Sequence, residues 1–467
     1  MILEATPTPD SDGMSSAQKS AIKNQKLTGV RGGGVAGIAA AVRLAGRGVA
    51  VTLVEMRPRL GGRATSLEDP ETGGLIDNCQ HVTMRCCTAL TELYETLGVA
   101  GRVAWHGRYH FVHADDTADT LAAGPLPAPL HLAGSFLRFQ GLTFGDKWAI
   151  GRALGKVRRM KRADREALNN TTFVAWLEQE RQPPRAVERF WEPTVVGACN
   201  ETVGAVAAGY ALQVFANGLL AGRRGYEMGL SDVPLAELYD PAEAVVTAAG
   251  GRLLRPASLR GLDYDPDTKR VTAARLADGT RLTADAYVSA LPFDALDRVI
   301  DDPLRRDDER LGRLGELHTS PILGLHLWVR RPDRRPVLER PHVVLTGSPI
   351  HWFFDHGTDA DGVQHLHGVV SAAHDLIDRP NAETLDLAFD ELRRVAPAAD
   401  DVEFVRGRVI KERRATFSAR PGVDTLRPAT TGTVRNLLLA GDWTATGWPA
   451  TMEGAARSGF AAADAVV

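Results

Sequence analysis

Small apolar residues dominate the first regular stretch of the chain. Residues 35–45 are almost entirely Ala, Val, Gly, Ile and Leu, which is typical of a helix that packs closely on a sheet. The apolar run 49–54 predicts a strand buried on both faces. Near the end, the run 436–440 predicts a similar strand, and residues from about 450 to 466 predict a final helix. This pattern indicates an α/β fold with a parallel sheet.

The middle of the chain has a different pattern. Between residues 251 and 292, turn signals such as Ala277-Asp278-Gly279-Thr280 separate three strand-like runs, 253–264, 270–276 and 281–290. These runs predict a β meander. The longer stretches on either side show helical periodicity mixed with a few strands.

The order of these patterns predicts two interleaved domains. We expect a Rossmann-like dinucleotide-binding domain with a parallel sheet and the β meander, and a mixed α+β substrate domain formed by two inserts. The expected segments are a disordered tail at 1–25, dinucleotide-binding segments at 26–104, 241–293 and 406–467, and substrate-domain segments at 105–240 and 294–405.

A glycine-rich turn opens the first predicted helix. Gly32, Gly34 and Gly37 fit the pattern G-x-G-x-x-G, which permits a tight turn, close approach of a pyrophosphate and close packing of helix on strand. Glu55 ends the next strand about twenty residues on, where an acid accepts the hydroxyls of an adenosine ribose. The sequence therefore predicts a dinucleotide site.

Two further features favour FAD over NAD. A second glycine doublet, Gly61-Gly62, is followed by Arg63, placed to meet phosphate or flavin oxygens, and NAD enzymes have no general need for it. The C-terminal strand runs into Gly441-Asp442, and the N-terminus of the last helix suits a flavin carbonyl that gains negative charge on reduction. FAD is the predicted cofactor.

The first strand departs from the usual apolar pattern. It carries Gly29 in its interior and Arg31 just before the turn. A buried unpaired arginine is costly. Either Arg31 reaches solvent or a phosphate, or this strand is weakened and flavin affinity suffers.

Composition excludes several classes of function. The chain has 467 residues, 44% apolar and 24% charged, as expected of a soluble globular protein with two or three domains. A net charge of -3 gives no indication of nucleic acid. The four cysteines form no paired C-x-x-C motif, so we expect neither a metal site nor disulfides, and a reducing, cytoplasmic compartment. No apolar run reaches eighteen residues, so no spanning helix is expected.

With these motifs in place, the chain resembles the flavin amine oxidase and phytoene desaturase superfamily, and within it the hydroxysqualene dehydroxylases, also called squalene-associated FAD-dependent desaturases. The resemblance covers nearly the whole chain from about Lys26. Cys79 stands where a glycine is usual. The matching stretches are Leu75-Ile76-Asp77-Asn78-Cys79-Gln80-His81, Leu126–Leu132, Phe190-Trp191-Glu192-Pro193 and Gly447–Gly459.

The resemblance implies reduction of hydroxysqualene, a linear triterpenoid, to squalene with loss of water. Reduced flavin would give the hydride, and an acid would protonate the departing hydroxyl. His81 is the first candidate for this acid, with Asp77 either to orient it or to cap the local turn. Glu453 is the second candidate, with a role as partner of the helix dipole as the alternative. The reductant of the flavin is not identified. Motifs and resemblance together assign the following residues to FAD: Gly32, Gly34, Val35, Ala36, Gly37, Glu55, Met56, Arg57, Gly61, Gly62, Arg63, Gln80, His81, Leu259, Ala290, Gly441, Asp442, Ala450, Thr451 and Met452.

Residues 130–150 are rich in Leu, Phe and Trp and are followed by a cluster of Arg and Lys up to Arg162. This pattern indicates peripheral contact with the inner face of a membrane. An amphipathic helix packed on the core, with a solvated basic face, is the alternative.

Other functions stay open at this stage. A carotenoid-type or phytoene-type desaturase would use the same fold and cofactor with the opposite direction of electron flow. An amine oxidase and a protein that has lost its cofactor are further alternatives.

Overall fold

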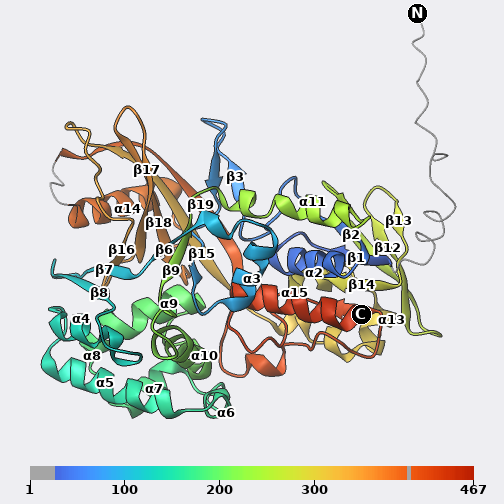
Figure 1. Cartoon of the computed structure of the whole chain (residues 1–467), viewed down its shortest axis with the longest axis horizontal. Helices are drawn as coiled ribbons and strands as arrows, with labels where there is room; N and C mark the ends of the chain where they lie inside the picture. Colours follow the sequence, from blue (N-terminus) through green and yellow to red (C-terminus); the bar gives the residue numbers. More distant parts are fainter. Residues whose placement is uncertain (1–26, 397–400) are drawn as a thin grey trace, which may run out of the picture.

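The computed structural model describes residues 27–396 and 401–467, so the tail predicted at 1–25 lies outside the described residues (Figure 1). At its centre is a five-stranded sheet in which all neighbouring strands are parallel. Its strands come from positions far apart in the sequence, as the apolar runs predicted. Their order is β10 (Arg252–Leu254), β2 (Ala50–Val54), β1 (Leu27–Arg31), β14 (Ala286–Ser289) and β20 (Leu437–Leu439).

Helices pack on one face of this sheet. The small-residue helix α2 (Val35–Gly46) contacts both α15 (Met452–Val466) and α11 (Pro241–Ala248), and α15 also contacts α3 (Thr88–Thr96). A Cβ on Gly459 would lie 2.1 Å from the Ala36 carbonyl oxygen, so glycine is required where α15 crosses α2. This close crossing joins the two ends of the chain.

An antiparallel meander covers the other face, where Leu262, Val271 and Ala274 share a core with Tyr287 and Leu437. The run predicted as one strand over 281–290 is in fact two strands, because its second half leaves the meander and joins the parallel sheet as β14. The meander strands are β11 (Leu259–Asp265), β12 (Arg270–Leu276) and β13 (Arg281–Leu282).

A second, seven-stranded sheet forms the other half of the molecule. Its pairs are antiparallel apart from β16 and β7, which run parallel. β19 belongs to this sheet by its pairing with β15, although the sequence assigned residues 406–467 to the dinucleotide-binding domain. The order is β19 (Glu403–Phe417), β15 (Thr319–Arg330), β18 (Val363–Ser371), β17 (Trp352–Thr358), β16 (His342–Leu345), β7 (Arg108–Val112) and β8 (Ala118–Ala122).

A group of helices lies at the lower left of Figure 1, at the opposite end from the parallel sheet. Its core is aromatic, with Phe173 and Trp191 each in ring contact with both Trp176 and Phe215. The helices are α4 (Ala133–Arg138), α5 (Phe144–Arg159), α6 (Arg162–Glu166), α7 (Phe173–Gln179), α8 (Pro184–Ala186), η3 (Val187–Trp191), α9 (Glu192–Cys199), α10 (Ala208–Val214) and η4 (Phe215–Leu220).

Shorter elements connect these parts. The remaining strands are β3 (Ser66–Glu68), β4 (Leu75–Asp77), β5 (Thr83–Met84), β6 (Val103–His106) and β9 (Met228–Ser231). The remaining α-helices are α12 (Phe293–Asp297), α13 (Asp302–Asp307) and α14 (Asn381–Val395), and the remaining short helices are η1 (Ala100–Arg102), η2 (Leu130–Leu132), η5 (Leu235–Leu238), η6 (Glu309–Leu311), η7 (Leu314–Glu316) and η9 (Val423–Thr425).

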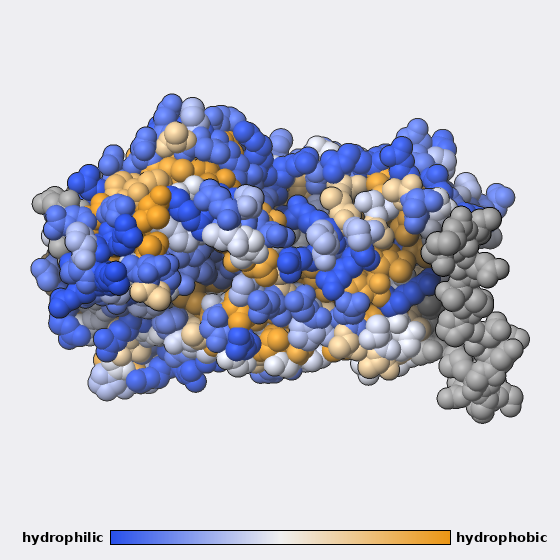
Figure 2. Space-filling view, turned by 90° about the horizontal axis from the view of Figure 1, so that it is seen from above, coloured by the Kyte–Doolittle hydropathy of each residue, from blue (hydrophilic) through white to orange (hydrophobic). Residues whose placement is uncertain are grey.

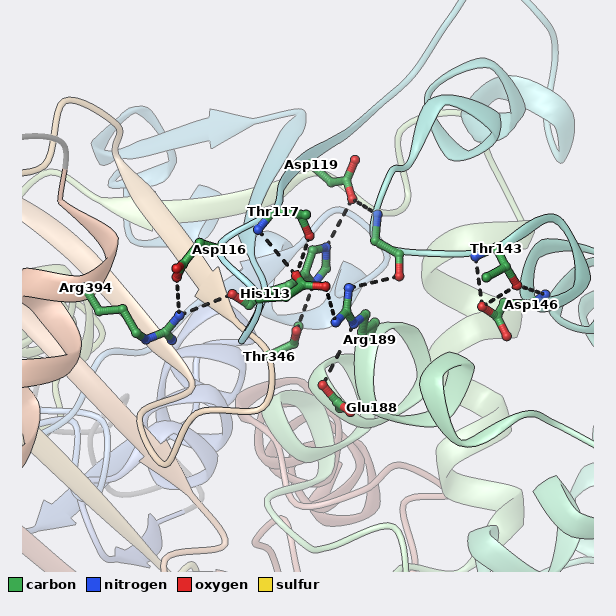
Figure 3. Close-up of polar contacts among 12 residues, drawn as sticks. His113, Asp116, Thr117, Asp119, Thr143, Asp146, Glu188, Arg189, Thr346 and Arg394 are labelled. Carbon is green, nitrogen blue, oxygen red and sulfur yellow. Dashed lines mark hydrogen bonds and ion pairs between the residues drawn. The ribbon is translucent and has the colours of Figure 1, made fainter.

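The β7–β8 hairpin is held by a buried polar network (Figure 3). His113 lies with one ring nitrogen 2.8 Å from the Thr346 hydroxyl and the other 3.1 Å from the Asp119 carboxylate. Asp119 also accepts from the backbone N–H of Gly141, at 2.7 Å. Arg189 donates to the Gly141 carbonyl and to Asp115, in the hairpin turn. The network thus ties the hairpin to β16, to η3 and to the loop before α5.

The surface in Figure 2 is mostly hydrophilic, with smaller hydrophobic areas. Within residues 27–396 and 401–467, no helix is both long enough and apolar enough to cross a membrane. Cys79, Cys86, Cys87 and Cys199 are free thiols.

Candidate functional site

One large cavity, of about 960 Å³, runs from the glycine turns into the helical end of the molecule. Its first part is lined by the turns that follow β1 and β2 and by the residues around Gly441. Thr194, Gln213 and Asn217 belong to the wall of the same cavity. Its far part, which we call the apolar arm, has these apolar wall residues: Tyr109, Phe111, Leu121, Phe136, Phe139, Phe190, Val214, Leu219, Met228, Ile322, Val344, Trp352, Phe354 and Val369. The cavity therefore joins a dinucleotide-type turn to a long hydrophobic space.

The first glycine turn has the geometry that the sequence predicted. Gly32 has φ = 100°, and a Cβ there would lie 2.7 Å from the Ala290 carbonyl oxygen. A Cβ on Gly37 would lie 1.8 Å from the Gly32 carbonyl oxygen, so Gly37 packs the helix on the turn and does not line the cavity. Gly34 caps α2 without any side-chain bond to its first turn. The backbone N–H groups of the first turn of α2 are therefore not capped by a side chain, and Val35 and Ala36 in this turn line the cavity.

Glu55 lies at the carboxyl end of β2, in the cavity wall. Its carboxylate accepts from the backbone N–H of Gly33 at 2.6 Å and of Arg57 at 2.7 Å. These two bonds fix an acid beside the glycine turn, where a ribose would need an acceptor.

The second glycine doublet touches the first turn. A Cβ on Gly62 would lie 2.9 Å from the Gly34 Cα, so the two loops meet only because both are glycine. Arg63 donates to the Asp442 carboxylate and, at 2.9 Å, to the Ala415 carbonyl. This arginine therefore connects the N-terminal loop to the residues after β20 and to β19.

Of the two sequence expectations for Arg31, contact with solvent or a phosphate gains no support, and a weakened first strand stays a prediction. Arg31 is only 2% exposed, so it does not reach solvent. Its guanidinium packs back over Gly29, where a Cβ would lie 2.9 Å from Nη2, and beside the Tyr287 ring. Arg31 belongs to the cavity wall, but its guanidinium lies over Gly29, two residues back along β1 from the turn, which gives no support for a phosphate contact. Burial lowers the pKa of Arg31 to about 10.

Asp77 does not line the cavity and has no bond to His81. Its carboxylate accepts from the Ser66 hydroxyl at 2.7 Å and from the Leu235 backbone N–H at 2.9 Å. Burial raises its pKa to about 6. These contacts indicate that Asp77 fixes the β3–β4 hairpin, so the expectation that it orients His81 gains no support.

His81 lines the cavity. Its Nδ1 lies 2.8 Å from the Cys79 carbonyl oxygen, which fixes the hydrogen on that nitrogen in the neutral ring. Burial lowers the pKa of His81, and the nearby Glu412 carboxylate acts against this shift. The Nε2 atom of the neutral ring is therefore an acceptor, and a proton donor forms only when the ring is protonated.

Glu412 is a cavity residue that the sequence interpretation missed. It lies on β19, where the Asn78 side-chain amide donates to it at 3.1 Å. The only sequence signal is an acid inside the basic run Lys411-Glu412-Arg413-Arg414. The structure brings this acid to the Asp-Asn-Cys-Gln-His segment across more than three hundred residues.

Glu453 lies in the cavity wall but is 1% exposed and fully engaged. It accepts from the backbone N–H of Ala89 at 3.2 Å and of Leu90 at 2.9 Å, and from Arg457 at 2.6 Å. Its carboxylate thus satisfies the first turn of α3. This arrangement favours a structural role for Glu453.

The profile of the flavin containing amine oxidoreductases matches residues 35–467. The chain belongs to this family. Its cofactor is FAD and its activity is that of an oxidoreductase, as the two glycine motifs predicted.

Two relatives of this flavoprotein cover nearly all of it. The hydroxysqualene dehydroxylase of Rhodopseudomonas palustris is 29% identical, over 95% of this chain and 98% of the relative. The 15-cis-phytoene desaturase of Synechococcus elongatus is 24% identical, over 94% of this chain and 95% of the relative. A putrescine oxidase redesigned in its cofactor binding has the same fold, with a TM-score of 0.71, 17% identity and coverage of 95% and 98%.

The residues of the flavoprotein fit FAD at both ends of the site. The touching glycine loops, the uncapped N-terminus of α2 and Glu55 suit the pyrophosphate and ribose. Thr451 accepts from the Gly454 N–H as the N-cap of α15 and lines the cavity. The other residues predicted to bind FAD that lie in the cavity wall are Met56, Arg57, Gly61, Gln80, Leu259, Ala290, Gly441, Asp442, Ala450 and Met452.

Proposed function

We propose that this flavoprotein reduces hydroxysqualene to squalene with loss of water. The observation that carries the proposal is the apolar arm, which opens directly from the dinucleotide end of the cavity. The relative from Rhodopseudomonas palustris, a hydroxysqualene dehydroxylase, supports this choice of substrate. In the reaction the allylic C–O bond breaks, a C–H bond forms at the same carbon, and the hydroxyl leaves as water. When bound and reduced, FAD supplies the hydride for the new C–H bond.

The walls of the apolar arm would hold the hydrocarbon chain and exclude water. Half of the residues of the arm are aromatic, Phe111, Phe136 and Phe190 among them. Ionisation of an allylic alcohol creates a cationic centre that water would trap, so a dry arm favours hydride addition over return of the hydroxyl. A linear triterpenoid matches this space because it can bend along the arm.

A proton must reach the departing hydroxyl. His81 and Glu412 both line the cavity, and the His81–Glu412 electrostatic interaction favours the protonated ring. We propose that His81 gives the proton from Nε2, and that Glu412 stabilises the ring while it carries two protons. Asp77 and Glu453 have no part in this step.

The test is an anaerobic experiment with the flavin-loaded protein. The enzyme is reduced with dithionite, hydroxysqualene is added, and absorbance near the flavin maximum is recorded while the products are extracted. We expect the oxidised flavin spectrum to return in proportion to squalene formed. Flavin that stays reduced, with no squalene, would reject the proposal.

A desaturase is the second candidate, because the relative from Synechococcus elongatus is a 15-cis-phytoene desaturase. Its reaction would run in the opposite direction, from oxidised flavin and a saturated bond. Reduction of the oxidised enzyme by phytoene, with no response of the reduced enzyme to hydroxysqualene, would select this alternative.

A further inference from the structure

Exposed apolar side chains are concentrated in one segment of the chain, where Lys147 of α5 donates to the Leu137 carbonyl of α4 at 2.8 Å. Leu126, Leu130, Leu137, Phe144 and Trp148 are 47%, 57%, 63%, 80% and 70% exposed. We call this surface the α4–α5 face. All five residues lie within 23 positions of sequence, whereas the other large exposed apolar residues of the described ranges, such as Val405, lie elsewhere. Such a concentration on the surface of a folded chain indicates an interaction site.

Helix α5 places cations on both sides of this apolar surface. Phe144, Trp148, Gly151 and Gly155 are spaced three or four residues apart, so they form one stripe along the helix. Around the helix, Arg152 and Lys156 lie on one side of the stripe, and Lys147 and Arg158 on the other. An apolar stripe between two rows of cations is the pattern of a helix that lies in a membrane interface.

The charge of this region differs from that of the whole chain. Residues 126–162 contain eight Lys or Arg and one acid, Asp146, whereas the complete chain has a net charge of -3. Asp146 is buried in the capping box of α5, with Thr143. Lys156 forms an ion pair with Glu180 and Arg162 with Glu166, whereas the exposed Arg158 and Arg159 keep the α4–α5 face net positive, which suits a surface of anionic lipid headgroups. A second copy of the same face would be repelled.

Helix α4 separates this face from the apolar arm of the cavity. Phe136 and Phe139 line the cavity, while Leu137, between them, is 63% exposed. One short helix therefore has the hydrocarbon cavity on one side and the exposed apolar surface on the other. In Figure 1, α4 and α5 lie at the end of the molecule opposite the parallel sheet.

We propose that the α4–α5 face docks on a bilayer containing anionic lipids, and that substrate passes from the bilayer into the apolar arm beside α4. The docking step stands on the face itself, whereas the passage of a triterpenoid rests on the proposed function. Docking inserts Phe144 and Trp148 below the headgroups and brings the cations level with the lipid phosphates.

Sedimentation with vesicles tests the docking. The flavin-loaded protein is mixed with vesicles of phosphatidylcholine alone or with about a third of phosphatidylglycerol. We expect binding to the anionic vesicles, and a fall of about tenfold or more in the partition coefficient for Phe144→Ser/Trp148→Ser. The matched control is Val405→Ser, an exposed apolar residue outside the face. Phe144→Ser/Trp148→Ser and Val405→Ser should both keep the flavin spectrum of the original chain.

Charge reversal tests the cationic part of the face. Arg158→Glu/Arg159→Glu should weaken binding to anionic vesicles by about tenfold or more, since each cation near the surface contributes to binding. The control Arg334→Glu/Arg335→Glu changes two exposed neighbouring arginines away from α5 and should bind normally. Equal vesicle binding by all four variants and the original chain would overturn the proposal.

Two further outcomes would also overturn it. Absence of vesicle binding by the original chain is one. The other is a dimer in light scattering that Phe144→Ser/Trp148→Ser dissociates, since the face would then join two copies of this chain.

The route of the substrate is tested separately. Hydroxysqualene is supplied either within anionic vesicles or in detergent micelles. We expect Phe144→Ser/Trp148→Ser to lose most turnover from vesicles and to keep turnover from micelles. If the original chain docks normally but turns over hydroxysqualene from neither source, the proposed reaction is rejected and the docking stands. If Phe144→Ser/Trp148→Ser loses the same share of turnover from vesicles and from micelles, the proposed route of the substrate is rejected.

Discussion

Arg31 and Arg310 are both buried arginines, but their surroundings are opposite. Arg310 donates to Asp308, to the Thr430 carbonyl and to the Leu437 carbonyl. Arg31 has long contacts from Nη1 at 3.4 and 3.5 Å, and its Nε and Nη2 atoms have no partner among the described residues. A buried charge with few partners lowers stability, whereas removal of one member of a buried ion pair leaves the other charge buried and unpaired.

We therefore predict opposite effects of the same substitution. Arg31→Met should leave the free energy of unfolding unchanged or raise it by about 1 kcal/mol, because a buried charge is lost and its volume is kept. Arg310→Met should lower it by about 3–5 kcal/mol, because Asp308 would remain buried without its partner. Urea denaturation of the flavin-loaded proteins measures both. Loss of flavin in Arg31→Met would instead mean that the guanidinium holds the cofactor.

These residues show why single positions are hard to predict. Gly29 looked like a defect of the first strand, yet it makes room for the Arg31 guanidinium, because residues two apart share one face of a strand. Asp77 and Glu453 were chosen for their motifs, and a motif does not say which way a carboxylate points. Glu412 was missed because its neighbour Asn78 is distant in sequence.

The contacts of these acids predict different kinetic effects. Glu453→Gln should lower the free energy of unfolding by about 1–2 kcal/mol, because the carboxylate caps α3, with little change in kcat. His81→Asn and Glu412→Gln should lower kcat by about a hundredfold at unchanged thermal stability. Stopped-flow reoxidation of the reduced enzyme by hydroxysqualene, beside thermal melts, separates the two effects. A large loss of kcat in Glu453→Gln at an unchanged melting temperature would assign catalysis to Glu453.

At the scale of elements, the β7–β8 hairpin matters because it carries Tyr109, Phe111 and Leu121 into the apolar arm. Its position depends on Asp119, which accepts from His113 and from two backbone N–H groups of the loop before α5. Loss of this acceptor would leave buried donors unsatisfied.

We expect Asp119→Ala to lower the free energy of unfolding by about 1–3 kcal/mol and to raise KM for hydroxysqualene more than it changes kcat. Flavin binding should be unaffected, because the hairpin lies away from the glycine turns. Asp116→Ala is the control, since its side chain is 73% exposed and belongs to the outer end of the same network. Steady-state kinetics measure KM for both variants. Equal KM values for Asp119→Ala and Asp116→Ala would contradict the prediction.

Elements with a strong local pattern were predicted well. The helix expected over 35–45 is α2, Val35–Gly46, and the helix expected from about 450 is α15, Met452–Val466. β19 was not predicted as a strand, because its Arg and Lys residues conceal the strand pattern and its partner β15 begins over eighty residues earlier. Pairing between distant strands is not encoded in local periodicity.

At the scale of the whole molecule, buried histidines are the main link between pH and stability. Burial lowers the pKa of His326 and His351 to about 4 and of His342 to about 3. Each is neutral in the folded chain, whereas an unfolded histidine takes up a proton near pH 6.5. Their contribution is complete above that pH and is lost as the pH falls below it. Asp77, with its pKa raised to about 6, acts in the opposite direction between pH 6 and 4.

We predict that the free energy of unfolding falls by several kcal/mol between pH 8 and pH 5, at roughly 2 kcal/mol for each of these three histidines. His367 contributes to this fall, since burial lowers its pKa well below the usual value and its ring nitrogens have no partner among the described residues. His367→Leu should therefore make the free energy of unfolding fall less steeply as the pH is lowered. Urea midpoints at half-unit steps of pH measure it, and a flat profile for the original chain would contradict the prediction.

The parallel sheet also bears on how the protein is made. Its strands β1 and β20 belong to one sheet but are about four hundred residues apart in the sequence. The glycine turns are therefore translated long before Gly441 and the N-terminus of α15, which meet them in the folded protein. We conclude that FAD cannot be fully enclosed until both of these later segments have been made, and that the apolar arm stays open on that side until then.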